Sequence, residues 1–224
     1  MGIIRSLLGC SLVLALTASQ LQGAIITPTS AVASSQFAAA VNTINGSGLD
    51  GIGPVASQLH SNDENHLWQS FSSPSSGNSI EFTLDQVYDL SDAHIWQYSG
   101  LVAGPPSFRA MWREVEDLDI SISPDLVSPY ASLGTKTLNA ASNPEGSPLP
   151  SFTEPAQSFA LAGANLARRV KITILTTYDA ANDDGFAGLS EVRFEGTAIP
   201  EPTTLALGAM ALCSLPWIVR RKRG

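Results

Sequence analysis

The chain has 224 residues, of which 44% are hydrophobic, so it suits one ordinary domain with a buried core and excludes disorder throughout. Residues 25–199 hold 7 basic and 19 acidic side chains, while the whole chain has a formal net charge of −8. A body this acidic would repel phosphate backbones, and we therefore expect no nucleic-acid partner.

The first 24 residues have the pattern of a secretory signal peptide. One arginine precedes an apolar run over residues 6–18, and Ala24 is a small residue that fits the position before a cleavage point. Cleavage after Ala18 or Ser19 is the alternative. We expect residues 1–24 to direct export and to be removed.

Both cysteines lie near the ends of the chain, Cys10 in the expected signal peptide and Cys213 in an apolar tail. The body between them therefore has no disulfide, no thiolate metal site and no cysteine nucleophile. A metal held by oxygen ligands is the remaining kind of internal cross-link.

The body is dominated by strand patterns. Residues 25–43 are rich in Ala, Ser, Thr and Asn, so we expect a flexible segment there and an ordered domain over residues 44–197. Within that domain apolar and polar residues alternate with the period of two that is typical of a half-buried strand. The clearest alternating stretches are SIEFTL at 79–84, DLDISIS at 117–123, RRVKITI at 168–174 and EVRFE at 191–195.

Segments rich in Gly, Pro, Asn and Asp separate these stretches, and no part of the body has a long helical period. Many short strands joined by such turns indicate an all-β fold, an antiparallel β-sandwich or jelly roll. The turn segments are SPSSGNS at 73–79, GPPS at 104–107, NPEGSPLP at 143–150 and ANDDG at 181–185.

The order of several motifs over about 150 residues resembles that of a discoidin, or coagulation factor 5/8 type C, domain. This resemblance implies a galactose-binding-domain-like sandwich. The motifs are INGSGL at 44–49, LWQSF at 67–71, SIEFTLDQVYDLSDAHIWQYS at 79–99, REVEDLDISIS at 113–123, ARRVKITI at 167–174 and GLSEVRFEG at 188–196.

The resemblance also implies a ligand, commonly a carbohydrate or else another surface molecule, bound by loops at one end of the sandwich. A sugar ring needs an aromatic face beside hydrogen-bonding groups that fix its hydroxyls. On that basis Trp112, Tyr98, Trp96 and Arg109 are the expected ligand residues. For Trp96, and for Trp68 as a further platform, the alternative is a place in the core, because both lie inside strand motifs.

A structural calcium ion is the one cofactor that the resemblance implies. Calcium takes several oxygen ligands with some carboxylate charge. Asp50 and Glu191 occupy positions where such domains draw an early loop against the last strand, so they are the expected ligands. The alternative is that each is an ordinary carboxylate in a turn or at a sheet edge.

Catalysis has little support in the sequence. The three histidines do not form the HExxH pattern, and neither a GxSxG motif nor a Gly-rich phosphate loop occurs. A glycosidase carboxylate pair is defined by distance in space and not by spacing in the sequence, so it stays open here. We expect a module that binds and does not cleave.

The end of the chain, residues 198–224, has three parts in a fixed order. Pro200, Glu201 and Pro202 precede the uncharged residues 203–219, and four basic residues follow at 220–223. As a helix the uncharged run would be about 26 Å long, enough to span a bilayer core with the basic end on the cytoplasmic side. A plain membrane anchor is one interpretation of this order.

The same order resembles the PEP-CTERM sorting signal of bacteria. The resemblance implies that an exosortase-type enzyme is a partner, that the chain passes through an inner-membrane intermediate, and that the tail is removed. Delivery to the outer surface or extracellular matrix would follow. Two functions from different classes therefore remain: a surface protein that binds extracellular polysaccharide, and a structural matrix protein without a specific glycan ligand.

Overall fold

The computed structural model describes residues 23–71, 76–102, 108–109, 113–142, 151–161, 163, 165–179, 181 and 184–200, with only the backbone at 101–102 and 108–109. These residues form twelve strands and three short 3₁₀ helices, and no α-helix occurs among them. The strands are β1 Ala24–Ile26, β2 Ser30–Ala33, β3 Leu59–Ser61, β4 Trp68–Gln69, β5 Ser79–Gln97, β6 Leu101–Val102, β7 Phe108–Arg109, β8 Asp117–Ser123, β9 Ala131–Thr137, β10 Phe152–Ala160, β11 Leu166–Ile174 and β12 Gly188–Ala198; the 3₁₀ helices are η1 Ala40–Thr43, η2 Val55–Ser57 and η3 Glu64–His66.

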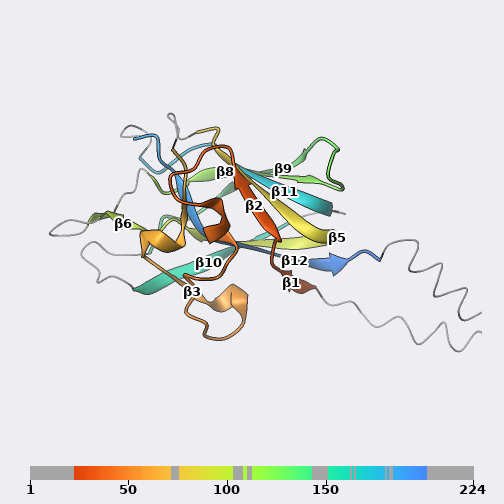
Figure 1. Cartoon of the computed structure of the whole chain (residues 1–224), viewed down its shortest axis with the longest axis horizontal. Coiled ribbons are helices and arrows are strands. Elements are labelled where there is room, and N and C mark those ends of the chain that lie inside the picture. The colour runs from red at the N-terminus through yellow and green to blue at the C-terminus, as the bar shows by residue number, and fades with distance from the viewer. Residues whose placement is uncertain are drawn as a thin grey trace, which may run out of the picture.

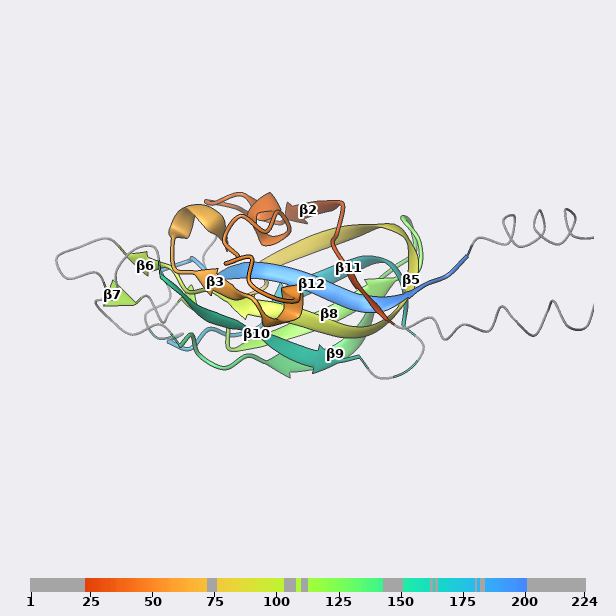
Figure 2. The ribbon, with the colours of Figure 1, turned by 90° about the horizontal axis from the view of Figure 1, so that it is seen from below.

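The long strand β5 contributes to both layers of a sandwich. Its first half pairs with β2 and β11, and β8 and β9 extend that layer beyond β11. Its second half pairs with β10 and β12, and β1 lies beyond β12. All these pairings are antiparallel, and Figure 2 shows β5 turning back on itself between the two layers.

The core lies between the layers. Phe82 from the first half of β5 meets Phe194 of β12 edge to face, with ring centroids 5.8 Å apart, and both side chains are fully buried. Because successive side chains of a strand point to opposite faces, the alternation in SIEFTL sends Ile80, Phe82 and Leu84 into this core. The same rule turns the apolar residues of β8 and β11 to this face of the same layer, and those of β12 face them from the other layer.

The structure confirms the all-β, antiparallel class for the described residues. β8 coincides with the predicted stretch at 117–123, and the other three predicted stretches lie inside β5, β11 and β12. The alternation is a reliable signal here because one face of each strand is buried in a single core.

The expectation of a flexible segment at 25–43 is wrong. β1 pairs with β12, β2 pairs with the first half of β5, and η1 buries Ala40 and Thr43. The segment has few large apolar residues, and its two strands are only 3 and 4 residues long, which hides its strand character. Its backbone nevertheless completes an edge of each layer, because strand pairing depends on main-chain hydrogen bonds and not on side-chain size. The ordered domain therefore begins near Ala24.

The described chain begins and ends at the same end of the sandwich, to the right in Figure 1. Ala24 lies opposite Gly196, and the N–H of Ile199 donates to the carbonyl oxygen of Val87 at 2.9 Å. We call the opposite end, where β12 begins at Gly188, the loop end.

The two expected targeting segments lie outside the described residues, apart from a few positions. Of the sorting motif the structure describes only Pro200. No helix within the described part of the chain is both long and apolar enough to cross a membrane.

Candidate functional site

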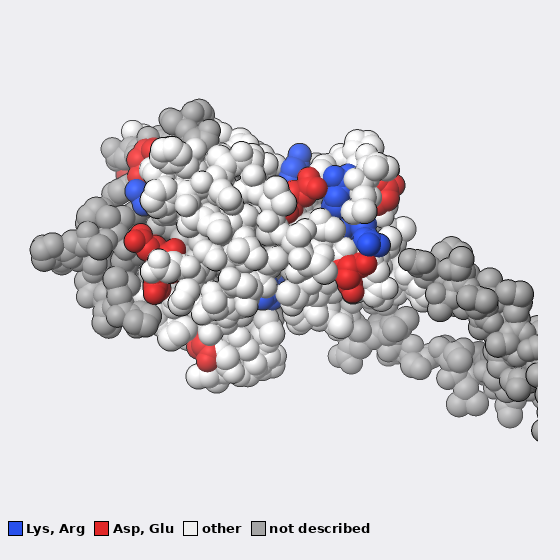
Figure 3. All heavy atoms as spheres, viewed as in Figure 1, with Lys and Arg blue, Asp and Glu red and all other residues white. Residues whose placement is uncertain are grey.

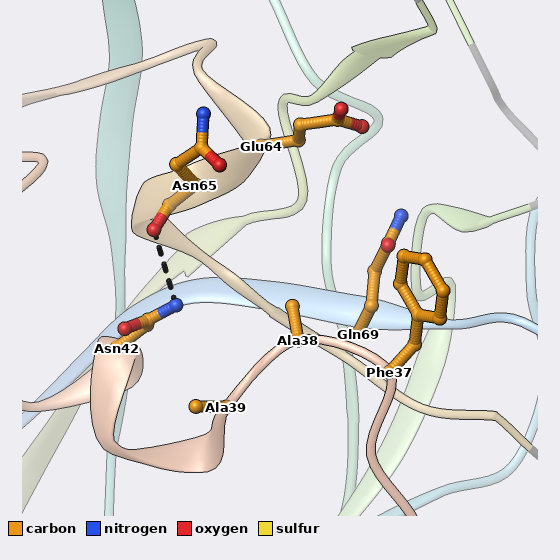
Figure 4. Close-up of a pocket in the computed structure, with 7 residues that line it drawn as sticks. All are labelled: Phe37, Ala38, Ala39, Asn42, Glu64, Asn65 and Gln69. Atoms are coloured by element: carbon orange, nitrogen blue, oxygen red, sulfur yellow. Dashed lines mark hydrogen bonds between the residues drawn. The ribbon is translucent and has the colours of Figure 1, made fainter.

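A hollow of about 280 Å³ opens at the loop end, between η1, η3 and β4 (Figure 4). Its walls combine one aromatic ring, three carboxamides and one carboxylate. The lining residues are Phe37, Ala38, Ala39, Asn42, Glu64, Asn65 and Gln69.

Main-chain contacts hold the polar wall in place. The side-chain amide of Asn42 donates to the carbonyl oxygens of Asn65 at 3.2 Å and Leu67 at 3.0 Å, and this ties η1 to η3. The carboxylate of Asp63 caps η3 by accepting from the Asn65 N–H at 2.9 Å. The hollow is therefore preformed, because its walls are fixed by hydrogen bonds that need no ligand.

The base of the hollow rests on a buried phenol. Gln69 donates from its amide nitrogen to the Tyr98 hydroxyl at 2.6 Å, and Tyr98 is only 1% exposed. Burial raises the pKa of Tyr98 to about 12, which keeps the phenol neutral at physiological pH. This contact fixes the orientation of the Gln69 amide in the wall.

Glu64 is the ionisable residue among those that line the hollow. Its side chain is exposed, and within the described part of the chain its carboxylate makes no hydrogen bond or ion pair. Figure 4 shows Phe37 and Gln69 side by side, with the Glu64 side chain extending from η3 above them. The carboxylate is thus available to a ligand in the hollow.

Three phenylalanines form an apolar surface beside the hollow, and Phe37 belongs to both. Phe37 and Phe71 are 69% and 64% exposed, and Phe186 is half-buried between them. Ring centroids are 5.4 Å apart for Phe37 and Phe186, 5.2 Å for Phe71 and Phe186, and 6.2 Å for Phe37 and Phe71. We call Phe37, Phe71 and Phe186 the Phe surface.

Backbone hydrogen bonds bring these three rings together from distant segments. The N–H of Phe37 donates to the Gln69 carbonyl at 2.8 Å, and the N–H of Ser70 donates to the Ala187 carbonyl at 2.8 Å. Gln69 and Ser70 directly precede Phe71, and Ala187 directly follows Phe186. The two bonds therefore join the three segments that carry the rings. The Phe surface is therefore a product of the fold and not of local sequence.

An ion pair supports the inner edge of the Phe surface. The guanidinium carbon of Arg113 lies 4.6 Å from the centroid of the Phe186 ring, and Asp184 accepts from Arg113 Nε at 3.0 Å and Nη2 at 2.7 Å. The pair holds the ring against the sandwich by a cation–π contact and largely cancels its own charge.

This arrangement has the two components that sugar recognition requires. The exposed rings can take the apolar face of a pyranose, and the amides and Glu64 of the hollow can bond its hydroxyls. The volume of the hollow lies near the lower end of the range of roughly 300–1,000 Å³ that is common for ligand sites, which suits a single ring.

The structure places two of the sequence-predicted ligand residues in the interior. Trp96 is 0% exposed and donates from its indole to the Gln58 carbonyl at 2.9 Å, and Tyr98 is bonded to Gln69. Neither ring presents a face to solvent, and Tyr98 contacts the hollow only through Gln69. Trp112 and the side chain of Arg109 lie outside the described residues.

Asp50 and Glu191, the expected calcium ligands, lie on the early loop and the last strand as anticipated, but their carboxylates have other partners. The carboxylate of Asp50 accepts from the Ile52 N–H at 3.0 Å in its own turn. Glu191 is fully buried and forms an ion pair with Arg193. Among the described residues no group of three or more His, Cys, Asp or Glu side chains could hold a metal ion.

Sequence reasoning missed the Phe surface because it considered only tryptophan and tyrosine as platforms. One signal was available: Phe71 ends the motif LWQSF immediately before a turn segment, and Phe186 follows the turn ANDDG. Aromatic residues beside turns are candidates for exposed loop positions. Their convergence with Phe37 depends on the tertiary fold and is invisible in the sequence.

No family model matches this chain, and no curated protein matches it. Solved structures with a similar fold include the family 32 carbohydrate-binding module from C. perfringens NanJ in complex with galactose, at 14% identity over 77% of this chain and 99% of that one, with a TM-score of 0.47. The same kind of module from AlyQ, in complex with 4,5-unsaturated mannuronic acid, is 16% identical over 76% of this chain and 97% of that one, with a TM-score of 0.48. The F5/8 type C domain of a Bacteroides fragilis protein is 11% identical over 80% and 99% of the two chains, with a TM-score of 0.46.

Proposed function

We propose that this chain is an exported, non-catalytic discoidin-like protein that binds carbohydrate, with one sugar ring in the hollow and a neighbouring ring on the Phe surface. The observation that carries the proposal is the position of Phe37, which is 69% exposed and lines the hollow while it packs against the other two rings. Exposed aromatic rings that adjoin a polar hollow are costly to leave in water without a partner.

A neutral glycan fits this site better than an anionic one. Glu64 puts a negative charge in the hollow, and Arg113, the nearest described cation to the Phe surface, is paired with Asp184. On the face shown in Figure 3 the charged side chains at the loop end are mainly acidic. A uronic acid or sulfated sugar would meet repulsion there, whereas a hydroxyl can donate to the Glu64 carboxylate.

The hollow also argues for binding without cleavage. Glycoside hydrolysis normally uses two carboxyl groups about 5 to 10 Å apart on either side of the bond that breaks. Among the described residues that line the hollow, Glu64 is the one carboxylate. The site can therefore orient a sugar but has no acid–base pair to act on it.

The proposal includes the route to the surface. The motif Pro200-Glu201-Pro202, the uncharged run and the basic end support sorting by an exosortase-type enzyme after an inner-membrane stage, with delivery to the outer surface or extracellular matrix. The fold supports this division of the chain, because β12 ends at Ala198 and, among the described residues, Ile199 makes the last backbone bond into the sandwich.

The test is a glycan array with the full-length chain, followed by calorimetry with the sugars that bind. We expect binding to neutral hexose-containing glycans with a dissociation constant in the micromolar to millimolar range, as suits a small, solvent-open site. Failure to bind any glycan on the array, or extracellular polysaccharide of the producing cell, would refute the proposal and favour the structural matrix role.

A further inference from the structure

An internal arginine occupies the junction at which a structural metal ion was expected. The early loop, residues 43–50, crosses the outer face of β12 near Glu191 and Arg193. These two side chains are 0% and 5% exposed, and they point to the same face because they are two residues apart on a strand. Val192 and Phe194 between and beside them point the other way, into the core.

The guanidinium of Arg193 links the strand to the loop. Its Nη1 forms an ion pair with Glu191 Oε1, donates to the Val192 carbonyl at 3.0 Å and lies 3.5 Å from the Thr43 carbonyl oxygen. Its Nη2 lies beside Gly46, where an added Cβ would be 3.5 Å away. The side chain thus contacts a loop carbonyl, a strand carbonyl and a buried carboxylate at once, as a bound cation would.

The other oxygen of the carboxylate also faces a donor. Glu191 Oε2 accepts from the Gly46 N–H at 3.3 Å. Burial raises the pKa of Glu191 to about 7, and Arg193 and the Gly46 N–H oppose that shift. These neighbours therefore offset part, but not all, of the cost of burying the charged carboxylate.

This donor set does not fit calcium. The ion needs about six to eight oxygen ligands, and the groups aimed at Glu191 are N–H donors, which cannot coordinate a cation. A guanidinium in contact with the same carboxylate would also repel a divalent ion. Asp50, the second expected ligand, accepts a hydrogen bond within its own turn.

We propose that Arg193 is a built-in substitute for a metal ion, which closes the early loop onto β12 through Glu191 and makes the stability of this fold independent of calcium. The arrangement is self-contained, since the cation is covalently part of the strand that carries its partner. The proposal is independent of the carbohydrate site, because none of its residues lines the hollow.

The test measures melting temperatures of the full-length chain in excess EGTA and in millimolar calcium. We expect the two values for the natural sequence to agree, and a rise with calcium would overturn the proposal. Arg193→Met leaves Glu191 as an unpaired buried charge, so its melting temperature should fall by about 10 °C in EGTA. Calcium should recover part of that loss.

Two further variants control for the effect of the substitution itself. In Glu191→Gln/Arg193→Met both charges are absent, so we expect a smaller loss than in Arg193→Met and no response to calcium. A double variant as unstable as the single one, or an Arg193→Met chain that ignores calcium, would show that the arginine does not take the place of a cation. If Arg193→Met does not fold, Arg193→Lys, which keeps a charge, should fold and remain indifferent to EGTA.

Discussion

Phe37 and Phe186 meet edge to face at the loop end, with ring centroids 5.4 Å apart and an interplanar angle of 87°, although one precedes η1 and the other precedes β12. The contact exists only when the start and the end of the domain are both in place. It joins the hollow on one side to the exposed ring of Phe71 on the other. The proposed carbohydrate site therefore depends on the folded domain at this position.

The first prediction concerns the exposed ring. Phe71→Ala should weaken glycan binding about 5- to 10-fold, because a stacked aromatic pair contributes about 1 kcal/mol beyond simple burial. The melting temperature should change little, since the side chain is 64% exposed. Calorimetric titration with an array-identified sugar measures the first effect, and a thermal melt measures the second.

Phe152→Ala is the matched control for that experiment. Phe152 is 43% exposed on β10 and belongs to neither the hollow nor the Phe surface. Its substitution should leave glycan affinity unchanged. Equal losses in the two variants would show that the effect is not specific to the Phe surface.

The second prediction concerns charge selectivity. Glu64→Gln removes the negative charge from the hollow and keeps a hydrogen-bonding side chain, so affinity for uronate-containing glycans should rise several-fold, most clearly at low salt. Affinity for neutral glycans should stay the same or fall slightly. Asp92→Asn, on β5 and outside the hollow, is the control and should change neither affinity. A neutral preference that survives Glu64→Gln would assign the selectivity to another group.

The strands could be predicted from the sequence because each buries one face. The alternating stretch at 117–123 has the same bounds as β8, and the other three stretches lie inside β5, β11 and β12. The bend in β5 could not be predicted, since the run from Ser79 to Gln97 contains no Gly or Pro to mark it. β1 and β2 were missed because strands of 3 and 4 residues are too short to carry a periodic signal.

The site was harder to predict than the fold, because exposure is a tertiary property. Trp96 and Tyr98 look like platforms in the sequence, yet their polar atoms find partners inside the protein. Glu191 was expected to bind a cation, and it does contact one, but the cation is Arg193 two residues away. The sequence shows which groups need partners, and the fold decides which partner each one finds.

The third prediction concerns acid stability. His60 is fully buried and packs against Gly48, and burial lowers its pKa from 6.5 to about 4. The unfolded chain therefore binds a proton below pH 6.5 that the folded chain excludes. Stability from this group is fully present above pH 6.5 and is lost as the pH falls from 6.5 to 4, by about 3 kcal/mol in total.

Urea unfolding at a series of pH values between 4 and 7.5 tests this dependence. Carboxylates also titrate near the lower limit, so the informative quantity is the difference between the natural sequence and His60→Asn, which can keep the bond to the Ser61 carbonyl. The variant should be less stable at pH 7.5 and should lose less stability on acidification. Parallel pH profiles would contradict a buried neutral histidine.

The fourth prediction concerns the close approach at the start of β12. A Cβ added at Gly188 would lie 2.4 Å from the Trp68 carbonyl oxygen and 2.5 Å from the Tyr98 ring. Gly188→Ala should therefore lower the free energy of unfolding by about 2 kcal/mol or more, since a backbone atom cannot yield as a flexible side chain can. Because Tyr98 positions Gln69, glycan affinity should fall as well. Urea unfolding and calorimetric titration measure the two effects, and an unchanged stability would mean that β12 shifts freely at this point.

The fifth prediction concerns processing at the other end of the molecule. Within the part of the chain that the structure describes, Ile199 makes the last backbone bond into the sandwich, to the Val87 carbonyl, so removal of everything after Pro200 should leave the fold intact. Mass spectrometry of protein from the cell surface should accordingly find chains that end near Pro200, with the same melting temperature as the full-length chain. Glu201→Ala should reduce this processing if an exosortase-type enzyme recognises the motif. Asp85→Ala is the control, because it removes an exposed carboxylate outside the motif, and it should leave processing unchanged. Surface material that still contains Arg223 would contradict removal of the tail and would favour a permanent membrane anchor.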